Sequence, residues 1–354
     1  MSMNRRERLL TVLRGGMADR IPWNCYAWLV PQNEASRRLQ EKGLSLMGTR
    51  RIFREVVSGA SIREETTLEG GETIYHTVIE TPVGTLTQRA IREKGYGSLW
   101  IREYFIKGVQ DYPAVEYLFR HTLCEPDYAP WIEADREMGE AGIVVGEIMP
   151  VPIMTLMVNW MGVEGLAEGI YEHTAEFEAL LDALTGLYMQ QMQIAAESPA
   201  EIIWFGDNVT GTIISPRLFE RYLAPTYARA LEVLRPAGKI PIAHYDGSNR
   251  PLVKCLARTA LPVIEAFTPP PGGDLSVVEA KAAWPDKVVW VNFPAGMFLE
   301  EEEVIFNYTL GLLEESAPGG RLVMGCTEDF PFEHFEKTFT AIGRALATYE
   351  GREW

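Results

Sequence analysis

A repeating order of apolar runs and amphipathic segments is the feature that most limits how this chain can fold. From about residue 115 onward, short and mostly apolar runs alternate with longer segments of helical periodicity. The strand-like runs are 142–148, 201–207, 240–246, 261–267, 287–293 and 321–329, and helical patterns cover 174–197, 215–234, 275–285 and 301–315. Strands that are apolar along their whole length are buried on both faces, which is typical of a parallel sheet covered by helices.

Two earlier runs bring the number of candidate strands to eight. Residues 21–28 form one such run, and residues 56–62 form a weaker one. Eight strand–helix units predict a (β/α)8 barrel, the TIM barrel fold of the α/β class. A doubly wound open sheet is the alternative, and it is less favoured because no GxGxxG or phosphate-loop motif follows an early strand.

The first hundred residues contain elements outside this rhythm. Asn4 is placed to cap a helix that runs through Arg14 and is followed by two glycines. Residues 72–90 alternate between polar and apolar side chains on both sides of a Pro-Val-Gly turn, which predicts a β-hairpin outside the main sheet. We therefore predict a single domain over residues 1–354, in which residues 1–100 include the N-terminal helix and the extra hairpin.

Composition excludes several classes of partner. The formal net charge is −16, which argues against nucleic acid or an anionic membrane surface, because both attract Lys and Arg patches. No stretch reaches the roughly 20 apolar residues that a membrane span needs. The four cysteines form no CxxC motif, and the start of the chain has a charged helical pattern without the apolar core of a signal peptide. These observations predict a cytoplasmic protein with free thiols.

Polar residues end most of the predicted strands. In chain order they are Glu147, Asp207, His244 with Asp246, Glu265, Asn292 and Cys326. A single histidine at a strand end is often only a hydrogen-bonded structural residue, and a buried cysteine often only packs. A barrel, however, brings the carboxyl ends of all its strands to one mouth. Histidine, cysteine and carboxylates are the ligand types of zinc, so the set predicts a metal site built from His244, Asp246, Glu265 and Cys326.

Seven segments carry a resemblance to a known family. They are "RRERLLTVLRGGMADRIPW", "ETPVGTLTQ", "YFIKGVQDYPAVEYL", "SPRLFERYLAPTYARALEVL", "IAHYDGSN", "IEAFTPPPGGDLSVVEA" and "MGCTEDFP", and they span nearly the whole chain. The sequence resembles the uroporphyrinogen decarboxylase superfamily, and within it the branch of corrinoid-linked zinc methyltransferases. The resemblance is specific for the superfamily and leaves the substrate open.

The decarboxylase itself is the first alternative within this resemblance. The resemblance implies that such an enzyme holds its acidic tetrapyrrole with an arginine-rich segment after the first strand. Here that segment reads "NCYAWLVPQNEASRR", and no arginine follows Trp23 until Arg37. The sequence therefore disfavours porphyrinogen decarboxylation.

The methyltransferase branch implies zinc on an H-x-C motif and a later cysteine, and related zinc methyltransferases add a glutamate between them. His244, Glu265 and Cys326 match these positions, whereas Asp246 stands where the family has cysteine. A carboxylate in place of a thiolate leaves a harder and more Lewis-acidic ion, which suits an oxygen leaving group. The resemblance therefore implies transfer of a methyl group from a small O-methyl donor, most suitably an aryl methyl ether of the guaiacol type, to cob(I)alamin.

The resemblance also implies partners and roles for other residues. No DxHxxG segment for holding cobalamin is present, so a separate corrinoid protein is expected to carry it. Glu147 and Asp207 are candidate general acids or orienting groups beside His244. The expected substrate-binding residues are Trp23, Tyr26, Trp204, Asn208, Tyr245 and Asn292, with Trp28 as a further wall of an aromatic slot. A homodimer is compatible with the sequence.

Other interpretations stay open. A methylamine or a thiol also suits a corrinoid-dependent methyltransferase of this type. A metal-free decarboxylase or lyase of the same fold would use Asp207 to stabilise a protonated intermediate. A non-enzymatic scaffold is the third possibility, and the gathering of ionisable residues at one end of the predicted barrel argues against it.

Overall fold

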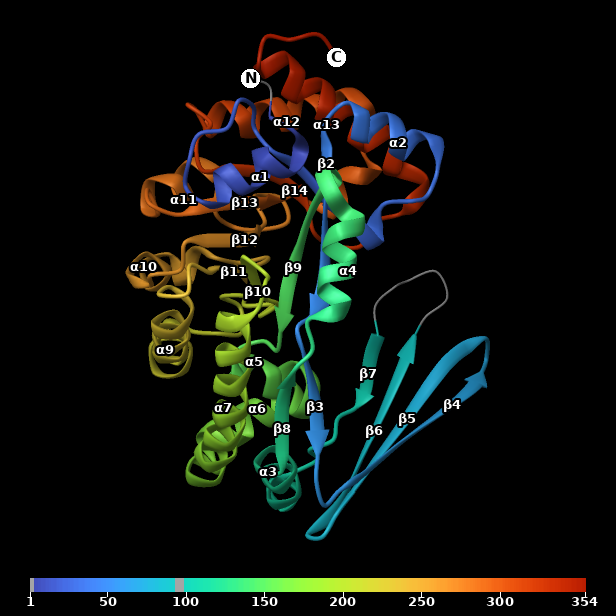
Figure 1. Cartoon of the computed structure of the whole chain (residues 1–354), viewed down its shortest axis with the longest axis vertical. Coiled ribbons are helices and arrows are strands. Elements are labelled where there is room, and N and C mark those ends of the chain that lie inside the picture. Colours follow the sequence, from blue (N-terminus) through green and yellow to red (C-terminus); the bar gives the residue numbers. More distant parts are fainter. Residues whose placement is uncertain (1–2, 93–98) are drawn as a thin grey trace. The chain divides into compact units, whose positions relative to one another are not determined.

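A computed structural model describes residues 3–92 and 99–354 (Figure 1). Contacts between Cα atoms divide the chain into two compact units. Unit 1 comprises residues 1–52, 128–148 and 195–354, and unit 2 comprises residues 53–127 and 149–194. The expected single domain over residues 1–354 stays a prediction, because two compact units can unfold together or separately.

Unit 1 contains a closed parallel barrel, as the sequence predicts. Its strands follow the order β1-β14-β13-β12-β11-β10-β9-β2. Their bounds are β1 Trp23–Tyr26, β2 Leu44–Arg51, β9 Gly142–Ile148, β10 Ile202–Phe205, β11 Ile240–His244, β12 Val263–Phe267, β13 Val288–Asn292 and β14 Leu322–Cys326. Five of the strands, β1 and β11 to β14, are buried along all or nearly all of their length, which explains why they appear in the sequence as continuous apolar runs.

Helices of unit 1 follow the strands and lie outside the sheet (Figure 1). They are α1 Arg5–Leu13, α2 Glu34–Glu41, α4 Ala129–Met138, α8 Pro216–Leu218, α9 Ala224–Leu234, α10 Val253–Arg258, α11 Val277–Ala283, α12 Glu302–Glu315 and α13 Phe335–Tyr349. A π-helical turn, Phe219–Leu223, joins α8 to α9 within the segment predicted as one helix. Helix α1 confirms the predicted N-terminal helix, because Asn4 accepts a hydrogen bond from the backbone of Glu7 in a capping box.

The second barrel strand is not the one predicted. Residues 56–62 contain the end of β3 (Phe53–Val57) and the start of β4 (Ser61–Glu69), separated by Gly59 with a φ of +71°. Both strands belong to unit 2. The barrel strand is β2, which lies earlier in the chain and ends in two exposed arginines. Its apolar run is short, and this is why the sequence pattern did not reveal it.

Unit 2 holds the extra hairpin and a helical segment. The hairpin consists of β5 (Glu72–Thr81) and β6 (Gly84–Arg92), and it forms a four-stranded sheet with β4 and β7 (Leu99–Glu103). A separate pair joins β3 to β8 (Thr122–Pro126). The helices are α3 Tyr112–Arg120, α5 Pro152–Thr155, the π-helical segment Leu156–Met161, α6 Gly162–Tyr171 and α7 Thr174–Glu197, of which the last residues count with unit 1. The prediction of a hairpin outside the barrel is confirmed.

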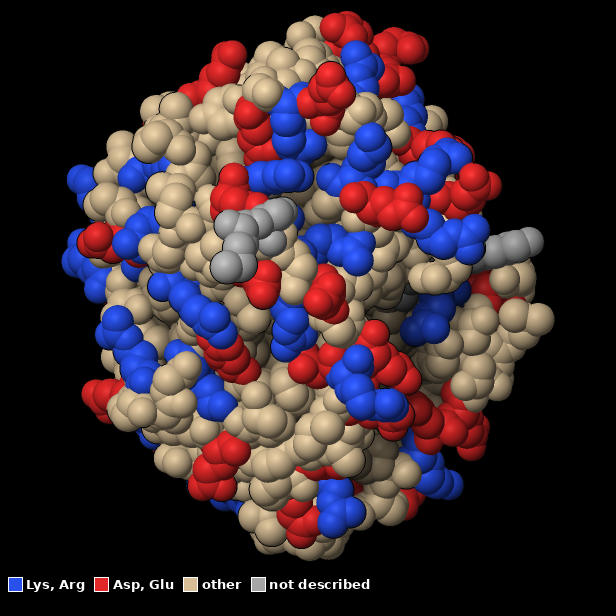
Figure 2. Space-filling view, turned by 45° about the horizontal axis from the view of Figure 1, so that its top comes forward, with Lys and Arg blue, Asp and Glu red and all other residues tan. Residues whose placement is uncertain are grey.

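Two surface properties bear on partners. On the face drawn in Figure 2, acidic and basic side chains are interspersed, so that face presents no continuous basic patch. Within residues 3–92 and 99–354, no helix is both long and apolar enough to cross a membrane.

Candidate active site

Four barrel strands, β1, β10, β11 and β12, each contribute one side chain to a buried hydrogen-bonded group at the carboxyl end of the barrel. His244 ends β11, and its register partner on β12 is Glu265. The Glu265 carboxylate is fully buried and accepts three hydrogen bonds, from the Tyr26 hydroxyl (2.6 Å), the Trp204 indole N–H (3.1 Å) and Nδ1 of His244 (2.9 Å). The Glu265 oxygen is the acceptor in this contact, so Nδ1 of His244 is its donor. The Nε2 atom of the same ring is left for other chemistry.

A backbone irregularity lies beside Glu265. The pairing of β12 with β13 shifts register between Ile264 and Phe267, and Ala266 has a φ of +59°. Alanine rarely adopts this left-handed conformation, which costs roughly 1–3 kcal/mol. Bulges of this kind re-aim side chains next to active sites. The irregularity therefore supports a functional role for the Glu265 side chain.

His244 is the central titratable group of the barrel mouth. Its side chain is 9 % exposed, and Nε2 lies 4.0 Å from Oδ2 of Asp246, which is 40 % exposed. Burial by itself lowers the pKa of His244, but the charge and hydrogen bond of Glu265, with the charges of Asp246 and Asp207, raise the pKa above its ordinary value. Burial and the charge of Glu265 raise the pKa of Tyr26 well above its ordinary value, so this phenol stays a proton donor to Glu265.

Aromatic rings stand next to this group, and three of the five predicted ones gather there. The ring of Tyr26 lies 4.4 Å from that of Trp28 and 6.1 Å from that of Trp204, and Trp204 lies 6.1 Å from the His244 ring. Trp23 does not join them. It stacks on Phe339 of α13 at 6.0 Å, because successive residues of β1 point to opposite faces of the sheet.

Cys326 also faces away from His244. It is the register partner of Cys25, and its thiol donates a long hydrogen bond to the Glu328 backbone carbonyl (3.9 Å). Tyr26 points into the barrel, so Cys25 lies on the opposite face of β1, the face that carries Trp23. Burial raises the pKa of the Cys326 thiol well above its ordinary value, which makes it a poor thiolate donor as it stands.

The four predicted zinc ligands are therefore not assembled as a set. Within residues 3–92 and 99–354, no group of three or more His, Cys, Asp or Glu that includes His244 has its ligand atoms within 4.8 Å of one another. Nδ1 of His244 is engaged by Glu265, so Glu265 orients the ring as an outer partner of a metal ligand would. Nε2 of His244 and Oδ2 of Asp246 lie 4.0 Å apart and fit a cation as a nitrogen and an oxygen donor, whereas the Glu265 carboxylate is already engaged by three hydrogen bonds.

Asp207 and Tyr245 belong to a separate, buried series of hydrogen bonds. Asp207 accepts a hydrogen bond from the Tyr227 hydroxyl (2.6 Å), which in turn accepts one from the Tyr245 hydroxyl (2.9 Å). Tyr227 lies on helix α9, so Tyr245 points outward from β11 while His244 points inward. Burial and the charge of Asp207 raise the pKa of both tyrosines well above the ordinary value. Tyr245 is thus a packing residue rather than part of the mouth.

The remaining predicted residues lie at the strand ends. Glu147 on β9 is the register partner of Trp204, which places it on the inner face. Asn208 is exposed, with a φ of +51°, a conformation that asparagine tolerates better than most residues. Asn292 is buried, donates to the Thr268 hydroxyl and accepts from the Thr327 backbone N–H, so it organises the mouth rather than offering free groups.

Glu328 is the site residue that sequence reasoning missed. It follows β14, accepts a hydrogen bond from the Ala295 backbone N–H (3.0 Å) and is also bonded to the side chain of Asn292. Burial raises its pKa, the hydrogen bonds of Ala295 and Asn292 lower it, and the charges of Asp246 and His244 act in opposite directions. The only sequence signal was an acidic residue two positions beyond Cys326, where the strand pattern was already ending.

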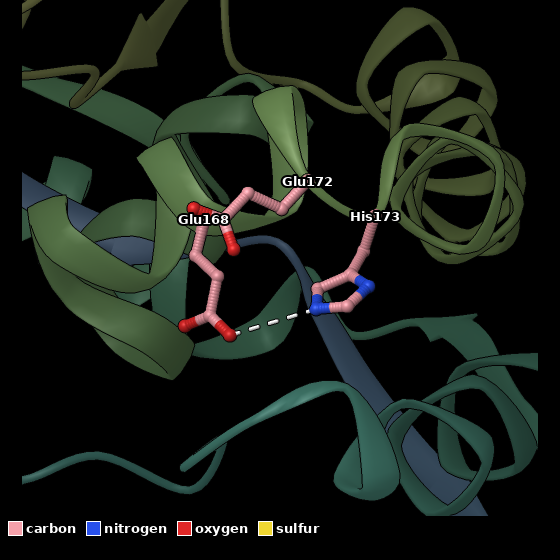
Figure 3. Close-up of side chains that lie close together, drawn as sticks. All are labelled: Glu168, Glu172 and His173. Carbon is pink, nitrogen blue, oxygen red and sulfur yellow. Dashed lines mark ion pairs between the residues drawn. The ribbon is translucent and has the colours of Figure 1, made fainter.

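A second cluster of metal-ligand types lies in unit 2. Glu168, Glu172 and His173 stand at the end of helix α6, and their ligand atoms lie within 4.8 Å of one another (Figure 3). Nε2 of His173 is 3.6 Å from a carboxylate oxygen of Glu168, and these side chains are 31 % and 47 % exposed. Exposed acidic groups are common without a bound ion, so closeness alone does not make this cluster a metal site.

Comparisons with known proteins identify the family. A family model described as uroporphyrinogen decarboxylase (URO-D) matches residues 133–331, which is more than half of the chain. No curated protein matches it. Among solved structures, the chain is similar to a sugar phosphate isomerase/epimerase from Parabacteroides distasonis, with 12 % identity, coverage of 92 % of this chain and 97 % of that chain, and a TM-score of 0.35. That likeness is too low to support an inference.

Proposed function

The chain belongs to the uroporphyrinogen decarboxylase family, and we propose that within it the chain is a methyltransferase that moves a methyl group from an aryl methyl ether to the cob(I)alamin of a partner corrinoid protein. Family membership supports a decarboxylase or a related methyltransferase. The observation that carries the choice is the chemistry around His244. Its oriented imidazole stands among aromatic rings and carboxylates.

Charge at the mouth disfavours an acidic tetrapyrrole. Asp246 and Glu265 place two carboxyl groups beside the two ring nitrogens of His244. The segment after β1, residues 27–36, contains no arginine or lysine that could hold acetate and propionate groups. A site of this charge repels a polyanion and accepts a neutral ring.

The roles of individual residues follow from the contacts. Glu265 holds the His244 ring with Nε2 directed at the mouth, and Tyr26 and Trp204 hold Glu265 in turn. Tyr26, Trp28 and Trp204 supply flat apolar surface against which an aryl group packs. When the aryl ring of the substrate is held in this way, its methyl carbon points in one direction, toward the opening of the barrel from which a corrinoid would approach.

The bond changes balance without an external oxidant. The bond between methyl carbon and ether oxygen breaks, and its electron pair leaves with the aryl oxygen as a phenolate. The attacking cob(I)alamin supplies the electron pair of the new bond to carbon. Negative charge develops on the leaving oxygen, and a positive group beside it stabilises that charge. His244 can supply this group, either as a protonated imidazole or by binding a cation. Zinc, when bound, would supply Lewis acidity at that oxygen, with His244 and Asp246 among its ligands.

The test is methylation of cob(I)alamin followed by its change in visible absorbance. Purified protein with free cob(I)alamin, or with a corrinoid protein, should convert a guaiacol-type ether to the phenol and give one methylated corrin for each phenol. Anisole, dimethylamine and methanethiol serve as competing donors. Turnover of the amine or the thiol without any ether would refute the substrate class. Light scattering of the same preparation tests the expected homodimer.

A second candidate is a metal-free decarboxylase or lyase, and the buried Asp207 favours it. A carboxylate that is fully buried and bonded to Tyr227 could stabilise a protonated intermediate. Release of carbon dioxide from an aromatic or pyrrole acid, abolished in Asp207→Asn and unaffected by chelators, would support this reaction. Absence of carbon dioxide from such acids, together with ether demethylation, would exclude it.

A further inference from the structure

A second cavity of unit 1 lies at the amino end of the barrel and has a volume of about 270 Å³. Its walls come from three stretches of the chain, which are residues 15–17, 281–287 and 318–321. Helices α1 and α11 lie beside β13 and β14 at this end (Figure 1). Lys287 and Arg321 directly precede β13 and β14, whose other ends reach the mouth. The cavity is therefore separate from the site around His244.

Every charged residue in the cavity wall is a cation. These residues are Lys281, Lys287 and Arg321, and the wall contains no Asp or Glu. Within residues 3–92 and 99–354, none of the three has a carboxylate oxygen within 4.0 Å of its side-chain nitrogens. Lys287 is only 7 % exposed. Buried cations are usually paired with an anion, so three unpaired ones around one cavity call for a negative ligand.

Backbone carbonyl groups hold the three cations around this space. Nζ of Lys281 donates to the carbonyl of Gly320 at 3.0 Å, directly before Arg321. Nη1 of Arg321 donates to the carbonyl of Asp286 at 2.7 Å, directly before Lys287. Each bond thus fixes one cation beside the backbone of the next. The cations are positioned by the fold rather than by contact with solvent.

A count of hydrogen-bond donors shows what the cavity can still offer. The ammonium group of Lys287 is fully engaged by the carbonyl and hydroxyl of Thr259 and the carbonyl of Leu261. Lys281 donates to two carbonyls, which leaves one of its three N–H groups. In the part of the chain that the structure describes, the Arg321 guanidinium makes one hydrogen bond, which leaves four of its five N–H groups. A ligand here is met by a guanidinium fork, one ammonium N–H and a further positive charge.

The backbone around the guanidinium is also unusual. Arg321 has a φ of +56°, a left-handed conformation that costs free energy in a residue other than glycine and that gathers at ligand-binding segments. Gly15 has a φ of +78°, and a Cβ atom at this position would lie 3.3 Å from Nη1 of Arg321. A glycine there leaves room for the guanidinium beside the cavity.

We propose that this cavity binds a phosphate group, either as inorganic phosphate or as the monoester of a small alcohol. A phosphate group presents several acceptor oxygens with up to two negative charges, which matches a guanidinium fork and two ammonium groups. A volume of about 270 Å³ is at the lower limit of ligand pockets, so the ester has few carbon atoms. The inference goes beyond the proposed function and does not depend on it.

The lysine side chains supply an independent readout. Burial lowers the pKa of Lys287 to about 8, against the opposing charge of Asp286 and with a smaller lowering by Arg235. Burial also lowers the pKa of Lys281. A bound anion favours the charged ammonium form and raises the pKa of both groups. Phosphate binding near pH 8 is therefore expected to take up protons.

Calorimetric titration of the full-length protein tests the proposal. The probes are inorganic phosphate and glycerol 3-phosphate at constant ionic strength in chloride, and each should bind saturably at one site per chain. Arg321→Gln should weaken binding roughly 10–100-fold, the range for lost hydrogen bonds to a charged group. Arg321→Gly should do the same, and glycine adopts a positive φ without strain. Arg136→Gln makes the same charge change at an exposed ion pair of α4 and should stay within about twofold of the parent.

Two arms identify the ligand and the site. Tighter binding of glycerol 3-phosphate assigns the site to a monoester, and tighter binding of inorganic phosphate assigns it to the free ion. Titrations at pH 8 in buffers of different ionisation enthalpy measure proton uptake, which should decrease in Lys287→Met.

Four results would overturn the inference. They are no saturable binding of either probe by the folded parent, parental affinity in both Arg321 variants, full proton uptake in Lys287→Met, and acetate binding as tight as phosphate. Circular dichroism of each variant separates a lost contact from lost folding. Methyl transfer is assayed separately, so failure at this cavity leaves the proposed function standing, and failure of methyl transfer leaves the phosphate site standing.

Discussion

Two clusters in this molecule contain the same kinds of side chain and differ in how they are held. In unit 1, His244 stands with Glu265 and Asp246, and in unit 2, His173 stands with Glu168 and Glu172 (Figure 3). In the unit 2 cluster the potential ligand atoms lie closer together, all within 4.8 Å of one another. The unit 1 group has the better-oriented histidine, because buried Glu265 bonds to Nδ1 while Tyr26 and Trp204 hold Glu265.

The comparison shows that proximity of ligand types is weak evidence of function. Glu168 and His173 are solvated, so their attraction is screened and their side chains are free to move. The Glu265 carboxylate has no exposed surface, so its three hydrogen bonds replace those that water would make. Burial with full hydrogen bonding is what fixes a ring nitrogen in one direction. The following predictions test whether this difference decides the function of each cluster.

The largest effect is expected on methyl transfer. His244→Ala removes the group beside the leaving oxygen, and loss of several kcal/mol of transition-state stabilisation corresponds to a fall on the order of 1,000-fold in rate. His173→Ala is the matched control and should keep the parental rate. Initial rates of cob(I)alamin methylation measure both. Equal rates in the two variants would contradict the proposal that His244 acts in methyl transfer and His173 does not.

The next effect concerns stability. Glu265→Gln keeps the size of the side chain but turns one acceptor into a donor that faces Tyr26, Trp204 or His244. Breaking such a buried charged network should lower the free energy of unfolding by about 3 kcal/mol. Glu168→Gln, at an exposed position, should change it by less than about 0.5 kcal/mol. Urea titrations followed by tryptophan fluorescence give the two values, and a larger loss in Glu168→Gln would contradict the argument.

A smaller loss is expected when only one donor is removed. Tyr26→Phe deletes the hydroxyl that donates to Glu265 at 2.6 Å and leaves that oxygen buried without this bond. The expected decrease in unfolding free energy is about 1–2 kcal/mol. Tyr171→Phe, at a tyrosine that is 68 % exposed, should have no measurable effect. The same denaturant titrations apply, and unchanged stability in Tyr26→Phe would mean that Glu265 is held by its other two donors alone.

A further prediction extends the comparison to pH. Burial lowers the pKa of Lys287 to about 8 from an ordinary value of 10.5, and its ammonium group donates to the backbone carbonyls of Thr259 and Leu261. Between these two pH values the unfolded chain binds this proton more tightly than the folded chain. The contribution of Lys287 to stability therefore rises with pH from about 8 to 10.5.

Thermal unfolding at several pH values checks this dependence. Lys287→Met should flatten the rise between pH 8 and 10, whereas Lys254→Met, at an exposed position, should retain it. A rise of the same slope in the Lys287 variant would assign it to other groups.

Part of the site could be predicted from single strands. His244 and Glu265 end two apolar runs, and neighbouring strands in a parallel barrel bring such residues together, as the register pair confirms. Tyr26 was expected at the mouth for its aromatic ring, but its hydrogen bond to Glu265 joins residues 239 positions apart. A contact between β1 and β12 depends on closure of the barrel, which no local pattern encodes.

The errors share one physical cause. A shift of one residue moves a strand side chain to the other face of a sheet. Trp23 was assigned to the mouth from its position near a strand end, but it stacks on Phe339 of helix α13, and Cys326 is in register with Cys25 on the same face of the sheet. Glu328 was overlooked because it follows the strand, where chain direction is set by the loop and by its bond to Ala295.

The amino-acid sequence by itself determined the alternation of buried strands and amphipathic helices, and hence the barrel, because apolar periodicity decides which surfaces leave water. It also determined which kinds of side chain stand at the strand ends. Only the tertiary structure decided which of them face one another. That choice depends on the register between neighbouring strands, which pairs His244 with Glu265, and on closure of the barrel, which brings Tyr26 of β1 to Glu265 of β12.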